Sequence, residues 1–190
     1  MKLYLSIISI SMLIISTLNI IFNTAPAHYV IIAVIWCTAM QFLLDGTIAI
    51  IINKMPNRWF GIDNPLYHVT VRERNFYTRL RVRHWKDKVW ELGGLGGFSK
   101  KELLYPSDPK YVEKFIIEYN KGVLTHRLSY PIGFLVMLMM SGAPVLTIAL
   151  PIAVVNLFLN ILPTIVLRHN TPMLKLLLKR INNRIRVHHI

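Results

Sequence analysis

A histidine and a carboxylate on one segment are the first residues of this sequence that could do acid–base chemistry. Glu118 and His126 are separated by about two helical turns, and on a helix starting at Pro109 the histidine shares the apolar face of Phe115 and Tyr119. A histidine titrates near neutral pH and can take a proton from a hydroxyl, while a nearby carboxylate orients its ring or stabilises its cation. The segment therefore predicts a general base. A histidine that only bonds a backbone carbonyl at the membrane interface is the alternative.

Three more polar residues lie inside strongly apolar stretches. Asp45 is the only acidic residue in such a stretch, and a carboxylate inside a membrane needs either a partner or a function. Asn156 and Asn160 stand four residues apart, so they share one face of a helix. The two asparagines could either form hydrogen bonds between helices or line a polar pocket. A neutral, structural role is equally open for Asp45.

The elements that position these residues are membrane-spanning helices. The chain has 190 residues, of which 54% are apolar and only 16% charged, and its mean hydropathy is +0.45. Residues 3–22 and 29–52 are each long enough to cross about 30 Å of hydrocarbon. A turn signal at 141–144 divides a further apolar block into predicted spans 128–141 and 145–167. We expect an all-α protein, residues 1–190 forming one membrane domain of four transmembrane helices in two hairpins.

The basic residues predict the orientation of these spans. Of the 22 Lys and Arg residues, Lys2 precedes the first span, 15 lie in 53–128, six lie in 168–190, and none lies in a hairpin turn. Since Lys and Arg near span ends stay in the cytoplasm, both termini and the 53–127 segment should be cytoplasmic in a multi-pass cell-membrane protein. The net charge of +13 then indicates anionic inner-leaflet lipid as a partner rather than nucleic acid.

Between the hairpins, residues 53–127 should lie along the membrane surface. Basic and apolar residues alternate over 78–85, which favours an extended strand, with a surface helix as the alternative. The glycine run 93–97 is a hinge or a phosphate-binding loop, and Ser99 with Glu102 has the spacing of a helix cap. Asp108 and Pro109 predict the start of a helix that runs through Thr125 into the third span.

The end of the chain predicts a separate amphipathic helix over 171–187, beginning at Thr171-Pro172. Its basic face carries Lys175, Lys179 and Arg184, and we expect the helix to lie on the inner leaflet. Its apolar face is formed by Leu174, Leu177, Leu178, Ile181 and Ile185.

Several enzyme classes are excluded by missing motifs. The chain has no P-loop, no G-x-S-x-G elbow and no H-E-x-x-H pair, which argues against an NTPase, a common serine hydrolase and a zinc peptidase. The lone Cys37 can form neither an intrachain disulfide nor a thiolate cluster, and we expect no metal and no cofactor. The H-x-x-x-x-D arrangement of soluble acyltransferases is also absent, because His84 and Asp87 are three residues apart. His84 is an interfacial aromatic or an alternative base.

Taken in order, the segments 55–60 (MPNRWF), 83–88 (RHWKDK), 118–126, Asn160 and 168–174 (RHNTPML) resemble the glycosyl-4,4'-diaponeurosporenoate acyltransferase family. Its members are small bacterial membrane proteins that acylate the sugar of a glycosylated carotenoid. The resemblance covers roughly residues 54–180 and depends on the order and spacing of the motifs.

The resemblance assigns positions to the site. The residues of this chain that match the family's motifs are Arg83, Trp85, Lys86, Glu118, Lys121, His126, Asn160, Arg168, Asn170, Pro172 and Leu174. The chain departs from the family pattern at Val123, Arg127, His169, Thr171 and Met173, and Pro163 is displaced by one position. Since these positions include predicted head-group contacts, the acceptor stays open between a carotenoid glycoside and another lipid or glycolipid.

These observations together predict an acyltransferase that moves a fatty acyl group from a thioester donor, acyl-CoA or acyl-carrier protein, to a lipid hydroxyl at the cytoplasmic face. The predicted catalytic residues are His126 as base and Glu118 as its orienting group. The predicted substrate-binding residues are Arg83, Trp85, Lys86, Asn160, Arg168, Asn170 and Asp45. A non-catalytic membrane subunit or lipid-binding adaptor with a basic cytoplasmic face is the alternative. Another lipid-modifying transferase, such as a methyltransferase, is a third possibility without a nucleotide fingerprint.

Overall fold

The computed structural model describes residues 2–22, 25–89 and 103–188, and every regular element in these ranges is helical. The all-α prediction is therefore confirmed, and the extended strand predicted over 78–85 is wrong. Helix α3 (Val71–Arg79) is capped at its N-terminus by Thr70, whose hydroxyl accepts from the Glu73 amide at 3.2 Å. Arg81 then turns the chain with a φ of 50° into the short helix α4 (Val82–Trp85). The glycine run and the Ser99 cap lie outside the described residues.

The chain forms two compact units, which are described separately. Unit 1 comprises Met1–Ile51 and Thr125–Leu162, and unit 2 comprises Ile52–Leu124 and Pro163–Ile190. Unit 2 contains 20 of the 22 Lys and Arg residues and eight of the nine Asp and Glu residues. Asp45 is thus the one acidic residue of unit 1.

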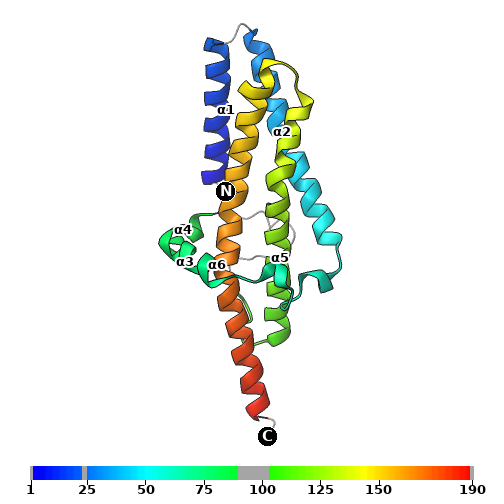
Figure 1. Cartoon of the computed structure of the whole chain (residues 1–190), viewed down its shortest axis with the longest axis vertical. Coiled ribbons are helices and arrows are strands. Elements are labelled where there is room, and N and C mark those ends of the chain that lie inside the picture. Colours follow the sequence, from blue (N-terminus) through cyan, green and yellow to red (C-terminus); the bar gives the residue numbers. More distant parts are fainter. Residues whose placement is uncertain (1, 23–24, 90–102, 189–190) are drawn as a thin grey trace. The chain divides into compact units, whose positions relative to one another are not determined.

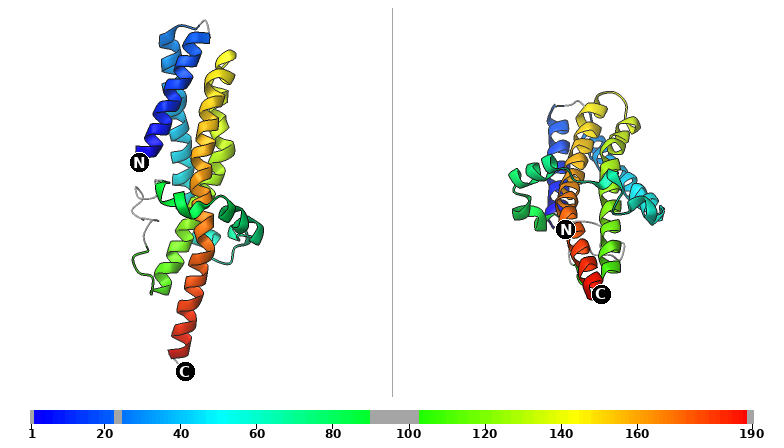
Figure 2. Two further views of the ribbon diagram at one scale, coloured as in Figure 1. Left: turned by 90° about the vertical axis from the view of Figure 1, so that its left-hand side faces the viewer. Right: turned by 60° about the horizontal axis from the view of Figure 1, so that its bottom comes forward.

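Unit 1 is built from long apolar helices that lie side by side in Figures 1 and 2. They are α1 (Lys2–Phe22), α2 (Ala27–Lys54) up to residue 51, the end of α5 (Pro109–Ile132), and the start of α6 (Leu150–His188). A 3-10 segment (Gly133–Met139) extends α5, and a π-helical turn (Val145–Ala149) precedes α6. Between them Gly142 has a φ of +67°, which confirms the predicted turn.

The core of unit 1 contains aliphatic side chains from α1, α2, the 3-10 segment, the π-helical turn and the start of α6, together with the fully buried Cys37. Polar contacts also tie α1 to the rest of the unit. The Asn19 amide donates to the Thr147 carbonyl at 2.8 Å, and the Tyr4 hydroxyl donates to the Leu159 carbonyl at 3.2 Å. In a regular helix the Leu159 carbonyl would accept from the N–H of residue 163, but Pro163 has none, so the Tyr4 hydroxyl takes that place.

Four helices in the described residues are long and apolar enough to cross a membrane: Tyr4–Phe22, Ala27–Lys54, Pro109–Met139 and Val145–Val187. They indicate a multi-pass membrane protein, and the first two agree with the predicted spans. The third and fourth are longer than predicted. Helix α5 begins where the sequence predicted, since the Asp108 side chain accepts from the Lys110 amide at 2.9 Å, and it runs through Thr125 as expected.

The separate tail helix predicted to begin at Thr171 is wrong. Helix α6 is continuous from Leu150 to His188 and includes both Pro163 and Pro172. The Thr171 hydroxyl donates to the Leu167 carbonyl at 2.8 Å, within the helix, instead of capping a new one. A proline inside a helix costs about 3 kcal/mol, which tertiary burial can offset.

The apolar face of this C-terminal stretch packs within unit 2. Leu178 and Ile181 of α6 are buried against Val112 and Ile116 of α5. Helix α5 thus covers much of the apolar face of this stretch, although Ile185 stays exposed, and contact of the helix with the inner leaflet stays a prediction. Elsewhere in unit 2, Phe60 is buried at the end of a 3-10 turn (Asn57–Phe60). The Phe60 carbonyl accepts from the Asn120 side chain at 2.8 Å.

Candidate functional site

Unit 1 brings together three of the residues predicted from the sequence. His126 lies on α5, Asn160 on α6 and Asp45 on α2. The Nδ1 atom of His126 lies 2.8 Å from Oδ1 of Asn160, and Nδ2 of Asn160 donates to Oδ2 of Asp45 at 3.2 Å. A histidine, an amide and a carboxylate thus form one hydrogen-bonded chain across three helices.

The surroundings of the Asn160 amide fix the tautomer of His126. The amide nitrogen has three acceptors on its side: Oδ2 of Asp45 at 3.2 Å, and the carbonyl and side-chain oxygens of Asn156, both at 3.1 Å. The amide oxygen must then face the histidine, and since it only accepts, Nδ1 of His126 carries the hydrogen. The lone pair of the neutral ring is left on Nε2, the nitrogen that can act as a base.

The Asp45 carboxylate is surrounded by neutral polar side chains. Asn156 donates to its Oδ1 at 3.4 Å, and Gln41 and Ser129 also face it, without a hydrogen bond of good geometry. We call Gln41, Asp45, Ser129, Asn156 and Asn160 the polar cluster. All except Asp45 are buried. Amide donors stabilise a carboxylate that apolar surroundings would otherwise destabilise.

A glycine allows this cluster to pack closely. A Cβ atom on Gly133 would lie 2.9 Å from Nε2 of Gln41 and 3.0 Å from Nδ2 of Asn156, closer than ordinary contacts. Sequence reasoning missed Gly133, Gln41 and Ser129. Their signal was present in part, because Gln41 stands four residues before Asp45, which puts both on one face of α2.

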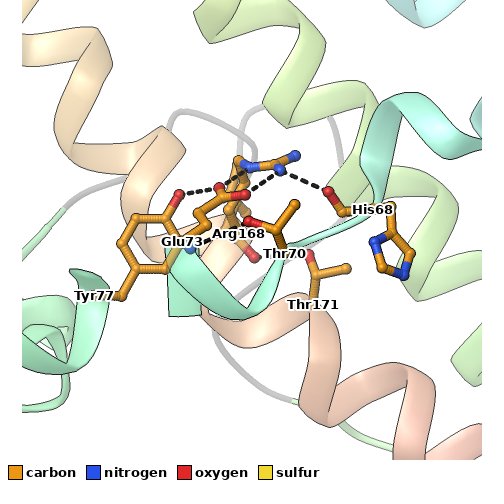
Figure 3. A network of polar contacts seen from close by, with 7 residues as sticks. His68, Thr70, Glu73, Tyr77, Arg168 and Thr171 are labelled. Atoms are coloured by element: carbon orange, nitrogen blue, oxygen red, sulfur yellow. Dashed lines mark hydrogen bonds and ion pairs between the residues drawn. The ribbon is translucent and has the colours of Figure 1, made fainter. Parts of the chain in front are cut away.

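Unit 2 holds a second network, centred on Arg168 (Figure 3). Arg168 is 4% exposed, and its guanidinium binds the Glu73 carboxylate through Nε and through Nη2, the latter at 2.6 Å from Oε2. Nη2 also donates to the His68 carbonyl at 2.9 Å, and the Tyr77 hydroxyl donates to Glu73. Burial, reinforced by Glu73, raises the pKa of Tyr77, so its hydroxyl remains a donor. Nε and Nη2 of Arg168 therefore join α6 to α3 and to the segment before it, and the substrate-binding role predicted for Arg168 stays a prediction.

The other predicted residues also lie in unit 2. Glu118 forms an ion pair with Lys121 at 3.1 Å, and the Lys121 ammonium lies 5.8 Å from the centre of the Phe60 ring. Arg83 and the alternative base His84 are exposed on α4. Trp85 donates to the Leu80 carbonyl at 3.0 Å, while Lys86 and Asn170 are half-buried. Their roles, including Glu118 as a partner of His126, stay predictions.

Comparison with protein families gives a match to the glycosyl-4,4'-diaponeurosporenoate acyltransferase family model over residues 56–180. The matched segment is about two thirds of the chain and includes His126, Asn160 and Arg168. The chain belongs to this family. The resemblance seen in the sequence motifs is thereby confirmed. Comparisons with curated proteins and with solved structures each gave no match.

Membership of this acyltransferase family implies an enzyme that acts on a carotenoid glycoside. The family therefore supports an enzyme of carotenoid biosynthesis over the non-catalytic adaptor that was the alternative from the sequence. Asp45 and Gln41 precede the matched segment, so the part of the polar cluster on α2 lies outside the family match. In the described ranges no group of three or more His, Cys, Asp or Glu side chains could hold a metal ion.

Proposed function

We propose that this acyltransferase moves a fatty acyl group from a thioester donor to a sugar hydroxyl of a carotenoid glycoside, with His126 as general base. The observation that carries the proposal is the hydrogen-bonded chain from His126 through Asn160 to Asp45. It presents Nε2 as a base and supports the positive charge that the ring acquires. General-base catalysis of this kind contributes about 10²- to 10⁴-fold to a rate.

The proposed reaction is a direct acyl transfer. Nε2 of His126 takes the proton of the sugar hydroxyl as its oxygen attacks the thioester carbonyl carbon. The tetrahedral intermediate then collapses, the carbon–sulfur bond breaks, and the imidazolium returns the proton to the leaving thiolate. The products are an ester and a free thiol.

We assign the orienting role to Asn160, with Asp45 behind it, and not to Glu118. Nδ1 of His126 is already bonded to Asn160, and the Glu118 carboxylate is paired with Lys121. Asn160 holds the His126 tautomer that carries its hydrogen on Nδ1, and the Asp45 charge stabilises the imidazolium through the Asn160 amide. This arrangement resembles in its logic the carboxylate and histidine of hydrolase triads, with an amide between them.

The membrane setting suits both substrates, because the acyl chain and the carotenoid dissolve in hydrocarbon. The chain of polar contacts lies on three of the four candidate membrane-spanning helices. We further propose that the reaction takes place at the cytoplasmic face, on the distribution of Lys and Arg.

Cysteine labelling of intact cells tests this orientation. In a Cys37→Ala background, Ser141→Cys should react with an impermeant maleimide added outside, and Arg83→Cys should react only after lysis. External labelling of Arg83→Cys would reverse the proposed topology.

Basic residues of unit 2, together with Trp85 and Asn170, are proposed to bind the polar parts of lipids and of the donor. Arg83, Trp85, Lys86 and Asn170 are the candidates for the donor head group. Lys179, Arg180 and Arg184 are exposed near the end of α6, where each adds about 1 kcal/mol of attraction to an anionic leaflet. Lys175, predicted for the same role, instead donates to the Ile62 carbonyl.

The experiment that tests the proposed function is acyl transfer by purified protein in nanodiscs. A glycosylated carotenoid is supplied as acceptor, with acyl-CoA or acyl-carrier protein as donor, and the ester is measured by mass spectrometry alongside released thiol. We expect ester and thiol in equal amounts with one of the two donors. Thiol release without ester, or no reaction with either donor, would contradict the proposal.

A further inference from the structure

A cavity in unit 1 borders the polar cluster and is not used by the acid–base chemistry above. It is partly open and is lined by residues of α1, α2 and α6. Its wall is mostly apolar, formed by side chains such as Met12, Ile15, Phe42, Ile152 and Val155. Because these helices are candidate membrane spans, the cavity can receive a lipid chain from the bilayer.

The polar end of the cavity carries buried groups without partners. Gln41 is 5% exposed, and neither its amide oxygen nor its amide nitrogen has a hydrogen bond in the part of the chain that the structure describes. The hydroxyl of Thr38, one turn earlier on α2, is buried and unbonded as well. Buried polar side chains are normally hydrogen-bonded, so these atoms indicate a ligand that supplies partners.

Asn156 connects the cavity to the reacting groups. Its side chain lines the cavity and also bonds Asp45 at 3.4 Å and Asn160 at 3.1 Å. Asn160 in turn bonds His126. A group bound at the polar end of the cavity therefore lies beside the chain that activates the hydroxyl.

We propose that this cavity binds the fatty acyl chain of the donor, with the Gln41 amide donating to the thioester carbonyl oxygen. The inference rests on the proposed function and adds the site of the acyl group. The polar groups of this otherwise apolar wall are Ser11, Thr38, Gln41 and Asn156, of which Asn156 is already bonded within the polar cluster. The unbonded Gln41 amide and Thr38 hydroxyl suit a ligand with a single carbonyl. A sugar with several hydroxyls would find too few partners here.

The short helix stretches that line the cavity also favour an acyl chain over the carotenoid. The lining residues of α1 extend from Ile8 to Ile15, and those of α6 from Ile152 to Leu159. Each stretch is about 10 Å long at 1.5 Å per residue. A flexible hydrocarbon chain can enter such a short groove and bend at its end, whereas a long conjugated polyene is rigid.

A photoreactive acyl-CoA with a diazirine on its acyl chain tests the proposal without any acceptor. The full-length protein in nanodiscs is irradiated with this probe, and labelled peptides are mapped by mass spectrometry. We expect label on the cavity-lining stretches of α1 and α6. Ser11→Trp, which fills the cavity from α1, should remove this label, whereas Ile10→Trp is the matched control because Ile10 is 56% exposed and does not line the cavity.

Donor chain length gives a second readout that depends on turnover. Ser11→Trp should shift the preferred donor toward shorter chains, since each methylene that loses burial weakens binding about fourfold. If Ser11→Trp does not fold, Val155→Phe narrows the same cavity from α6.

Label confined to other parts of the chain, or equal label in the Ser11→Trp and Ile10→Trp proteins, would overturn the acyl site and leave the proposed reaction standing if turnover is normal. Label in the cavity that Ser11→Trp removes, in a protein without turnover for any donor, would support the acyl site and contradict the proposed reaction.

Discussion

Replacing Asn160 by leucine removes the amide between His126 and Asp45 while keeping a similar volume. The variant loses the 2.8 Å contact to Nδ1 of His126 and the 3.2 Å donation to Asp45. During acyl transfer the first of these becomes a hydrogen bond to a charged imidazolium. Such bonds contribute about 1.5–3 kcal/mol, so kcat should fall about 10- to 150-fold.

Stability should fall as well, because Asn160 is 6% exposed and the variant leaves the Asp45 carboxylate with fewer donors. We expect a loss of about 1–3 kcal/mol in the free energy of unfolding. The assay combines kcat in nanodiscs with thermal melting of the same preparation. To separate the effect on catalysis from the effect on stability, the same two measurements are made on a variant of a second buried asparagine.

Asn19→Leu is that comparison. Asn19 is 4% exposed, and its amide donates to two backbone carbonyls at 2.8 Å, so its loss should lower the melting temperature while kcat stays near that of the wild type. The reasoning is refuted if Asn160→Leu melts like Asn19→Leu and retains wild-type kcat.

Two further predictions concern packing and the second network. Gly133→Ala puts a Cβ 2.9 and 3.0 Å from two amide nitrogens of the polar cluster, so it should lower the free energy of unfolding by about 1–3 kcal/mol and reduce turnover. Gly46→Ala is the control: a Cβ there has nothing within 4 Å and should be neutral or stabilising. Equal melting temperatures of the two variants would contradict this prediction. Glu73→Gln removes the charge that Arg168 binds. The Glu73 side chain is 21% exposed, which limits the loss in the free energy of unfolding to about 3 kcal/mol at most, and Tyr77→Phe should lose about 1 kcal/mol. A smaller melting shift for Glu73→Gln than for Tyr77→Phe would show that the ion pair adds little.

The parts of the fold that the sequence predicted depend on local signals. The first two spans are long apolar runs, and the start of α5 is an aspartate before a proline, which cap the helix without help from the rest of the chain. The continuity of α6 could not be predicted in this way. Its prolines are local stop signals that packing of Leu178 and Ile181 against α5 overrides.

The candidate site shows the same limit. His126, Asn160 and Asp45 could each be singled out, because polar side chains in apolar stretches need a reason. Their connection could not, since Asn160 bonds residues 34 and 115 positions away through helix packing. Arg168 was singled out too, but its partner Glu73 is 95 positions away, and only the fold shows that its Nε and Nη2 atoms bind this carboxylate.

Acyl transfer by His126→Gln protein tests the central claim most directly. Glutamine keeps part of the volume and the hydrogen bonding of histidine but cannot act as a base at neutral pH. With expression and melting temperature matched to the wild type, turnover of acyl donor and glycosylated carotenoid should fall about 10²- to 10⁴-fold. Turnover within a few-fold of the wild type in a folded His126→Gln protein would contradict the account and leave His126 a structural residue.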